Sequence, residues 1–313
     1  MSTTAYAADP EEYRSFSTGR KWFSPNDDKA WGEKLYLIFL PLFFAYNAVI
    51  QQMGWLDVGN FWHVTQNILM WFPYCIILPL ILRRNTGLPF YKQWWFKFQV
   101  YIFFIVFFET YFHTEYFFET LGMRYHFSKI TLYFDSYLLG PNQRTALAHD
   151  QRIPVGMYLN TMAFFTVYHS AAIVVIRRLV NLVRDLGGGS VAASLSQRLS
   201  GGQLVAFIIA TAFTAFFFAW AETFFYMTSA GHSNVWYIDL HTQLYIGSWC
   251  YALYFIFSFP NVFWLDETPR RAPWSLWYTA VQATAMTMFV LLLIDLWTMF
   301  SGAPFADSWP IPR

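Results

Sequence analysis

The sequence contains few charged residues. Only 12% of its 313 residues are Asp, Glu, Lys or Arg, whereas about 25% is usual for a soluble domain. Hydrophobic residues make up 56% of the chain and aromatic residues 22%. This composition predicts an integral membrane protein. The net charge of +1 excludes a strongly basic nucleic-acid-binding protein.

Several chemical signatures are also missing. The two cysteines, Cys75 and Cys250, lie in apolar segments and give no evidence of a disulfide framework. The seven histidines are too scattered for a di-iron or zinc cluster, so no metal site is expected. Neither a G-x-S-x-G motif nor a P-loop occurs. A retinal protein is excluded because the last lysine in the chain is Lys129.

Seven apolar stretches are long enough to cross a bilayer, which takes about 20 helical residues. They lie near residues 33 to 54, 61 to 82, 95 to 119, 154 to 176, 203 to 228, 243 to 263 and 275 to 300. We therefore expect an all-α, polytopic membrane helical bundle with about seven transmembrane helices. Pro41, Pro73 and Pro79 fall inside the first two stretches, where neighbouring groups make a kink tolerable.

The basic residues predict the orientation of the bundle. Most of the 20 Lys and Arg residues fall on the side of the N-terminus, which favours an N-in, C-out arrangement. The first 30 residues lack the apolar run of a cleaved signal peptide. We expect a multi-pass protein of the bacterial inner membrane or the endoplasmic reticulum, depending on the host.

A single membrane domain is expected over residues 31–302, between a polar cytoplasmic segment (1–30) and a C-terminal tail (303–313). Within it, the Gly/Ser-rich residues 186–202 predict a flexible cytoplasmic linker. The outer loop at 120–153 contains an apolar stretch and is interpreted either as an interfacial lid or as an ordinary loop packed on the bundle. No internal repeat suggests an inverted-repeat transporter.

Ionisable side chains interrupt the third apolar stretch near its far end. Helical spacing places Glu109, His113 and Tyr116 on one face and Tyr111 and Glu115 on a neighbouring face. An ionisable side chain in hydrocarbon costs about 2.5–3.5 kcal/mol on insertion scales. This concentration of polar groups therefore predicts a site inside the membrane.

Other apolar stretches carry isolated polar groups. His169, Glu222 and Asp295 interrupt the fourth, fifth and seventh stretches, and Asp239 lies in a short outer loop. A buried carboxyl disfavours its charged form, so a protonated acid is expected among them. Each of these groups could instead form a hydrogen bond between helices, and Asp239 could have a plain surface role.

Six motifs resemble the cycloeucalenol cycloisomerases, a family of sterol enzymes from plants and scattered microbes. The motifs are DKAWGEKLYL (28–37), YFFETLGMRYHF (116–127), VYHSAA with IRRL (167–179), WAET (220–223), YALYFIFSFPNVFWLDE (251–267) and LIDLW (293–297). They occur in family order and span nearly the whole chain. The chain departs from the plant pattern at His113 and Glu115, which stand where that pattern has Trp and His.

The resemblance implies a cofactor-free isomerisation. In such a reaction the 9,19-cyclopropane ring of a pentacyclic sterol, such as cycloeucalenol, opens to a Δ8 product. An acid must protonate the strained ring, aromatic faces must stabilise the carbocation, and a base must remove the proton on carbon 8. The expected partners are a sterol or another polycyclic lipid, and membrane lipids.

Roles follow from these demands. The expected acid is Glu222, with Glu115 next, and the expected base is His169 or His113; Glu109 and Asp295 complete the catalytic set. Aromatic candidates for stabilising the carbocation are Tyr111, Tyr116, Trp220 and Tyr254. Candidates for binding the sterol 3-hydroxyl are Asp239 and Tyr125.

Three alternative functions remain open at this point. One is a sterol double-bond isomerase of the emopamil-binding type, which also handles a sterol carbocation with carboxylates. The others are a non-catalytic sterol- or lipid-binding protein and a proton-coupled transporter with Glu109, Glu222 and Asp295 as its relay.

Overall fold

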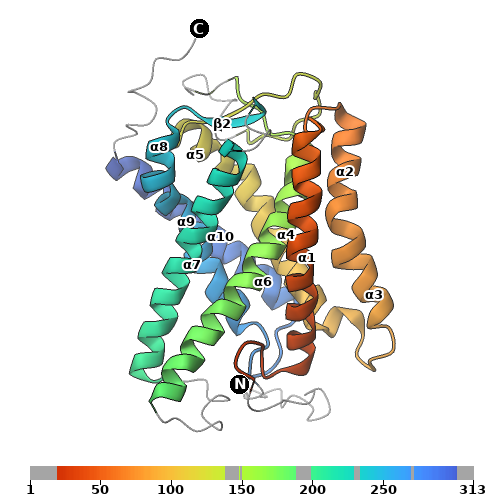
Figure 1. The fold of residues 1–313 in the computed structure, drawn as a ribbon, viewed down its shortest axis with the longest axis vertical. Coiled ribbons are helices and arrows are strands. Elements are labelled where there is room, and N and C mark those ends of the chain that lie inside the picture. The colour runs from red at the N-terminus through yellow and green to blue at the C-terminus, as the bar shows by residue number, and fades with distance from the viewer. Residues whose placement is uncertain are drawn as a thin grey trace, which may run out of the picture.

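The computed structural model describes residues 20–137, 148, 150–187, 199–228, 233–268 and 271–301. The chain forms a bundle of long helices with a two-stranded ribbon at one end (Figure 1). Within the described residues, seven helical segments are long and apolar enough to cross a membrane. They are Asp27–Gln52, Asn60–Leu82, Trp94–Glu119, Val155–Leu186, Gly201–Phe225, Leu240–Trp264 and Leu276–Phe300. The predicted all-α polytopic membrane bundle is confirmed.

Three of the seven segments contain a π-helical turn. The second segment consists of α2 (Asn60–Phe72), η2 (Pro73–Ile77) and α3 (Leu78–Leu82), and the third of α4 (Trp94–Phe108), η4 (Glu109–His113) and α5 (Thr114–Glu119). The sixth consists of α8 (Leu240–Thr242), η8 (Gln243–Gly247) and α9 (Ser248–Trp264). The uninterrupted helices are α1 (Asp27–Gln52), α6 (Val155–Leu186), α7 (Gly201–Thr228) and α10 (Leu276–Ser301), and a 3₁₀ turn, η3, covers Phe90–Lys92.

Helix boundaries agree with the apolar stretches except that α1 begins at Asp27 rather than near residue 33, and that α6 is longer than predicted. This helix continues to Leu186, ten residues beyond the predicted end at 176. The extension contains Arg177, whose charge marked the end of the apolar stretch in the sequence. Arg177 is nevertheless buried, because it pairs with carboxylates from other parts of the chain.

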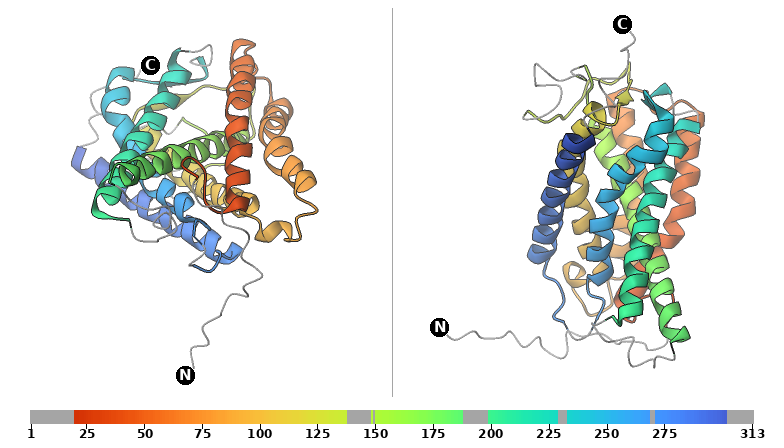
Figure 2. Two further views of the ribbon diagram at one scale, coloured as in Figure 1. Left: turned by 60° about the horizontal axis from the view of Figure 1, so that its bottom comes forward. Right: turned by 90° about the vertical axis from the view of Figure 1, so that its left-hand side faces the viewer.

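Helix α6 lies at the centre of the bundle (Figure 2). It packs against α1, α2, α4, α7 and α9, largely through aromatic side chains. The Phe164 ring lies 4.6 Å from that of Phe43 on α1, and the Tyr168 ring lies 4.8 Å from that of Phe218 on α7. Side chains of α6 therefore contribute to its interfaces with all five of these helices.

The loop after α5 and the loop after α7 meet in a short antiparallel ribbon. Strand β1 (Met123–Tyr125) pairs with β2 (Val235–Tyr237), with Met123 opposite Tyr237. The loop after β1 packs on the bundle and buries Phe127 and Ile130. Of the two interpretations of residues 120–153, packing on the bundle is what the described part of the loop shows; a location on the outer leaflet stays a prediction.

Ion pairs join the helices at the end opposite the ribbon. We call Lys29, Glu33, Arg177 and Glu267 the basal ion cluster. The Arg177 guanidinium donates to Glu33 at 2.7 Å and to both carboxylate oxygens of Glu267 at 2.7 and 2.8 Å. The Lys29 ammonium lies 3.0 Å from Glu267 and donates to three backbone carbonyls at the end of α9. The cluster thus ties together α1, α6 and the segment after α9.

The termini of the bundle lie at opposite ends, as an odd number of spans requires. Helix α1 begins at the end that carries the basal ion cluster, and α10 ends near the ribbon (Figure 2). The assignment of the first of these ends to the cytoplasm stays a prediction. Most of the predicted N-terminal segment, the middle of the Gly/Ser linker and the C-terminal tail lie outside the described residues.

Candidate active site

A pocket lies between the helices beneath the ribbon. Its walls come from the α4–α5 segment, α6, α7, α9 and both strands, and they enclose a cavity of about 80 Å³. This volume is well below the roughly 300–1,000 Å³ that is usual for small-molecule sites. The space is narrow, so a bulky polycyclic ligand must push side chains apart to enter.

The ribbon covers one end of this pocket. Tyr125 and Tyr237 line the pocket, as do their strand neighbours two residues away. Arg124 and Trp236, which lie between them in the two strands, do not line it. This alternation follows from the period of two in a β-strand, and it makes the outer loops part of the site.

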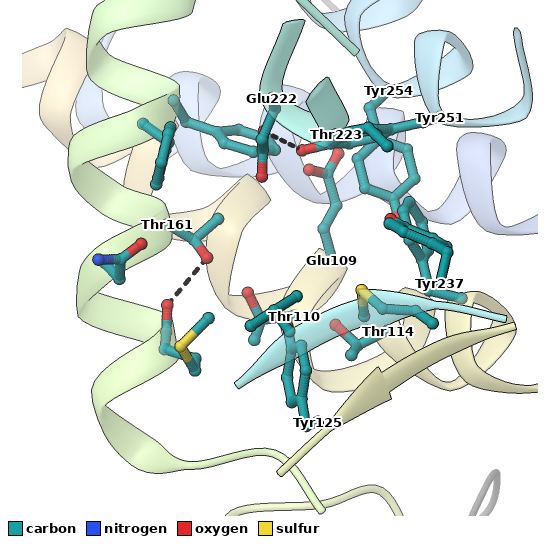
Figure 3. A pocket seen from close by; sticks show the side chains of 17 residues that line it. Glu109, Thr110, Thr114, Tyr125, Thr161, Glu222, Thr223, Tyr237, Tyr251 and Tyr254 are labelled. Carbon is teal, nitrogen blue, oxygen red and sulfur yellow. Dashed lines mark hydrogen bonds between the residues drawn. The ribbon is translucent and has the colours of Figure 1, made fainter. Parts of the chain in front are cut away.

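Glu109 is the first residue of the π turn η4, and its carboxyl group is directed into the pocket (Figure 3). The residue is 2% exposed, and neither of its carboxyl oxygens has a hydrogen-bond partner. A buried polar group without a partner is rare in native structures and calls for an explanation, and here the group faces a cavity. Thr110 and Thr114, on the same segment, also line the pocket.

The π turn changes which side chains share a face. Because such a turn holds an extra residue, the common face predicted for Glu109, His113 and Tyr116 does not form. The His113 ring instead packs against the ring of Tyr254, at 5.0 Å between centroids. The Tyr116 hydroxyl donates to Asp295 on α10 at 3.0 Å.

Glu222 on α7 supplies the second carboxyl group of the pocket. It accepts a hydrogen bond from the Tyr251 hydroxyl at 2.6 Å, and Tyr168 interacts with the same carboxyl group. The two acidic side chains therefore differ: hydroxyl donors surround Glu222, whereas Glu109 has none. Figure 3 shows both between Thr161 on one flank of the pocket and Tyr237 on the other.

Aromatic rings form much of the remaining wall. Tyr251 and Tyr254 on α9 pack edge to face at 5.2 Å, and the ring of Phe117 lies 5.0 Å from that of Tyr251. All three line the pocket. Aromatic faces attract a cation that is held against them in a dry site, so this wall suits a positively charged intermediate.

The pocket brings together four of the residues singled out from the sequence. Glu109, Glu222, Tyr125 and Tyr254 all line it. His113 lies behind Tyr254, in contact with its ring. The pattern of polar residues in apolar stretches, together with the family motifs, is what pointed to these positions.

Other predicted catalytic residues lie outside the pocket lining. One ring nitrogen of His169 is 2.8 Å from the Phe165 carbonyl oxygen and the other is 2.7 Å from the Ser258 hydroxyl. Both nitrogens are therefore occupied within the core, as in a structural histidine. Glu115 is buried away from the pocket, and Asp295 bonds to Tyr116 at the surface of the bundle. Their catalytic roles stay predictions that the geometry does not support.

The other predicted substrate-binding residues are also dispersed. Tyr111 stacks on Phe107, and Trp220 stacks on Phe224. Asp239 caps α8 by accepting hydrogen bonds from the backbone and side chain of Thr242. These hydrogen bonds lower the pKa of Asp239 below its ordinary value, as expected for a helix cap.

Several lining residues were not singled out from the sequence. Tyr251 lies three residues before Tyr254 in the same motif, and helical spacing could have placed both on one face. Tyr237 lies two residues before Asp239 in the same loop and carries no charge that would mark it. Asn160 follows the start of α6 by one helical turn and carries no charge that would mark it. Among the described residues, no group of three His, Cys, Asp or Glu side chains could hold a metal ion.

Comparison with known proteins gives one match along almost the full length. The chain is 26% identical over 285 residues to a protein of Arabidopsis thaliana named cycloeucalenol cycloisomerase. The alignment covers 90% of this chain and 89% of that protein. No family model matches the chain, and no solved structure matches it. The chain is thus similar, over most of its length, to a protein of the family that its motifs resemble.

Proposed function

We propose that this protein is a membrane-embedded sterol isomerase that opens the 9,19-cyclopropane ring of a pentacyclic sterol. Full-length similarity to the Arabidopsis protein supports the type of reaction. The observation that carries the proposal is the pocket itself. It holds two carboxyl groups in unlike surroundings, walled by tyrosines and placed within the membrane-spanning part of the bundle.

Glu109 is the proposed proton donor. No hydrogen-bond donor stabilises a negative charge on either of its oxygens, so the group is suited to hold a proton until a substrate accepts it. Glu222 is the proposed base, because the hydrogen bond from Tyr251 favours the carboxylate form. The sequence suggested Glu222 as the acid, and here it is the proposed base instead. Two carboxyl groups in unlike surroundings commonly divide the roles of acid and base in this way.

The reaction balances without an added reagent. The Glu109 proton adds to carbon 19 as the bond between carbons 9 and 19 breaks, which leaves a cation at carbon 9. The pocket tyrosines stabilise this cation, and exclusion of water prevents its capture. Glu222 then removes the proton from carbon 8, and the carbon 8–9 double bond forms. Transfer of the proton from Glu222 back to Glu109 restores the starting state.

A pocket between transmembrane helices suits a lipid substrate. A sterol dissolves in the bilayer and can reach the pocket from it, so no soluble domain has to deliver the substrate. The narrowness of the pocket also matches the chemistry, since a cation in a wide, wet cavity reacts with water.

The proposal is tested by offering two sterols separately to membranes that contain the protein. We expect conversion of a 9,19-cyclopropyl sterol to its Δ8 isomer and no change in a Δ8 sterol, with products followed by gas chromatography and mass spectrometry. Membranes without the protein provide the control. Conversion of the Δ8 sterol alone would instead identify a double-bond isomerase of the emopamil-binding type, and binding without any conversion would identify a binding protein.

Substituting Tyr251→Phe is expected to lower kcat for the cyclopropyl sterol about 10- to 100-fold. The hydroxyl bonded to Glu222 is lost, and a hydrogen bond to a charged group contributes about 1.5–3 kcal/mol. The ring remains, so KM should change little. Tyr254→Phe is the matched comparison, because Tyr254 lines the same wall but makes no such bond to Glu222 in the described structure. An equal loss in both variants would argue against Glu222 as the base.

A further inference from the structure

The α6 flank of the pocket carries a buried amide held in a fixed orientation. Asn160 lines the pocket and is 2% exposed. Its amide nitrogen donates to the side-chain oxygen of Asn67 on α2 at 2.9 Å, and the Asn67 nitrogen donates to the carbonyl of His63 at 2.8 Å. This chain of hydrogen bonds fixes where the Asn160 amide points.

A second buried amide lies at the same height on α1. Helices α1 and α6 run in opposite directions (Figure 1), and the rings of Phe43 and Phe164 meet across them at 4.6 Å. One helical turn towards the ribbon, α1 presents Asn47 and α6 presents Asn160. Asn47 is fully buried, and neither polar atom of its side chain has a hydrogen-bond partner.

His63 extends this polar region. It is 1% exposed, and its Nε2 atom has no partner. Its ring packs so tightly against Gly156 that a Cβ there would lie 2.5 Å from Nδ1. We call Asn47, His63, Asn67 and Asn160 the amide cluster. Buried polar groups are rarely left without partners, so such a cluster beside a pocket is typical of a site for a polar group.

We propose that Asn160 binds the hydroxyl group of the sterol substrate, with Asn67 as its positioning residue. This inference rests on the proposed function. A side-chain amide both donates and accepts hydrogen bonds, as a hydroxyl does. Asn160 lies five residues after the start of α6, about 8 Å along the helix, so the hydroxyl is held towards the end of the bundle that bears the ribbon.

The arrangement also orients the reacting carbons. A sterol carries its hydroxyl on the ring at one end, and the cyclopropane lies in the middle of the ring system. In the pocket, Glu109 and Glu222 lie between the α6 flank and the Tyr237 flank (Figure 3). A hydroxyl bound at α6 therefore places the cyclopropane beside the two carboxyl groups.

The test compares a 9,19-cyclopropyl sterol with its 3-deoxy analogue, in binding to the purified protein in nanodiscs and in turnover. The wild type should bind and convert the hydroxyl sterol about tenfold better or more, as one buried hydrogen bond provides. Asn160→Leu should remove this preference by weakening only the hydroxyl sterol, and Asn67→Leu should reduce it. Tyr125→Phe, at the other predicted hydroxyl anchor, and Ser170→Ala, elsewhere on α6, should keep it.

Each outcome separates this inference from the proposed function. If Asn160→Leu retains the preference, or weakens both sterols equally, the hydroxyl site is wrong; loss of preference in Tyr125→Phe alone would move the site to the ribbon. If the wild type prefers the hydroxyl sterol through Asn160 but converts neither compound, only the isomerase proposal fails. If the wild type binds neither sterol, both fail. Should Asn160→Leu not accumulate in membranes, Asn160→Ala gives the same comparison with a smaller apolar side chain.

Discussion

Replacing Glu109 by glutamine is expected to lower kcat for the cyclopropyl sterol about 10²–10⁴-fold, the usual contribution of a general acid. Glutamine keeps the shape of the side chain but has no acidic proton to give to the ring. Sterol binding should be retained, because the pocket volume is unchanged. The measurement is the initial rate of Δ8 product formation, normalised to the amount of protein in the membrane.

Glu115→Gln provides the matched comparison for this variant. Glu115 lies on the same segment and is equally buried, yet it does not line the pocket. We expect turnover close to that of the wild type. If the Glu115 variant is inactive and the Glu109 variant is active, Glu115 is the proton donor and the proposed site is wrong.

The Arg177→Ala variant should lose about 3–5 kcal/mol of stability, the usual effect of breaking a buried ion pair from one side. Without the guanidinium, Glu33 and Glu267 remain buried beside each other with only Lys29 to balance them. The loss should appear as a large fall in the thermal unfolding midpoint of the purified protein, and as reduced accumulation in membranes.

Arg178→Ala controls for the removal of a neighbouring charge. The Arg178 guanidinium packs over the exposed Trp22 ring at 5.5 Å, and a cation–π contact near the surface contributes about 0.5–1 kcal/mol. A small effect is therefore expected. Similar losses in the two variants would mean that the basal ion cluster contributes little to stability.

The sequence predicted the helices because their signal is local. In a membrane, a run of about 20 apolar residues has to form a helix to satisfy its backbone hydrogen bonds. The seven membrane segments could be predicted from such runs alone. The end of α6 was misplaced for the opposite reason. The burial of Arg177 is possible because it pairs with Glu33, which is 144 residues away in the chain. No local sequence pattern reveals that partner.

The candidate site was predicted in part for similar reasons. Glu109 and Glu222 stand out as carboxyl groups in apolar stretches. The π turn at Glu109 has no periodic signal, so the sequence assigned His113 and Tyr116 to the wrong face. His169 looked catalytic because a histidine in an apolar helix is unusual, but Ser258 and the Phe165 carbonyl satisfy it. Uncharged lining residues such as Asn160 could be recognised only once the helices were in place.

The basal ion cluster and the pocket occupy opposite ends of the bundle, and this separation sets how the protein can admit a bulky ligand. The α8–α9 segment holds 25 residues, or roughly 37 Å of helix. A rotation of about 5° around its anchored end moves its far end by about 3 Å. Tyr251, which lines the pocket, lies about 20 Å from the anchored end and moves about half as far, so small rotations of this segment can widen the pocket while the ion pairs at its other end stay in place.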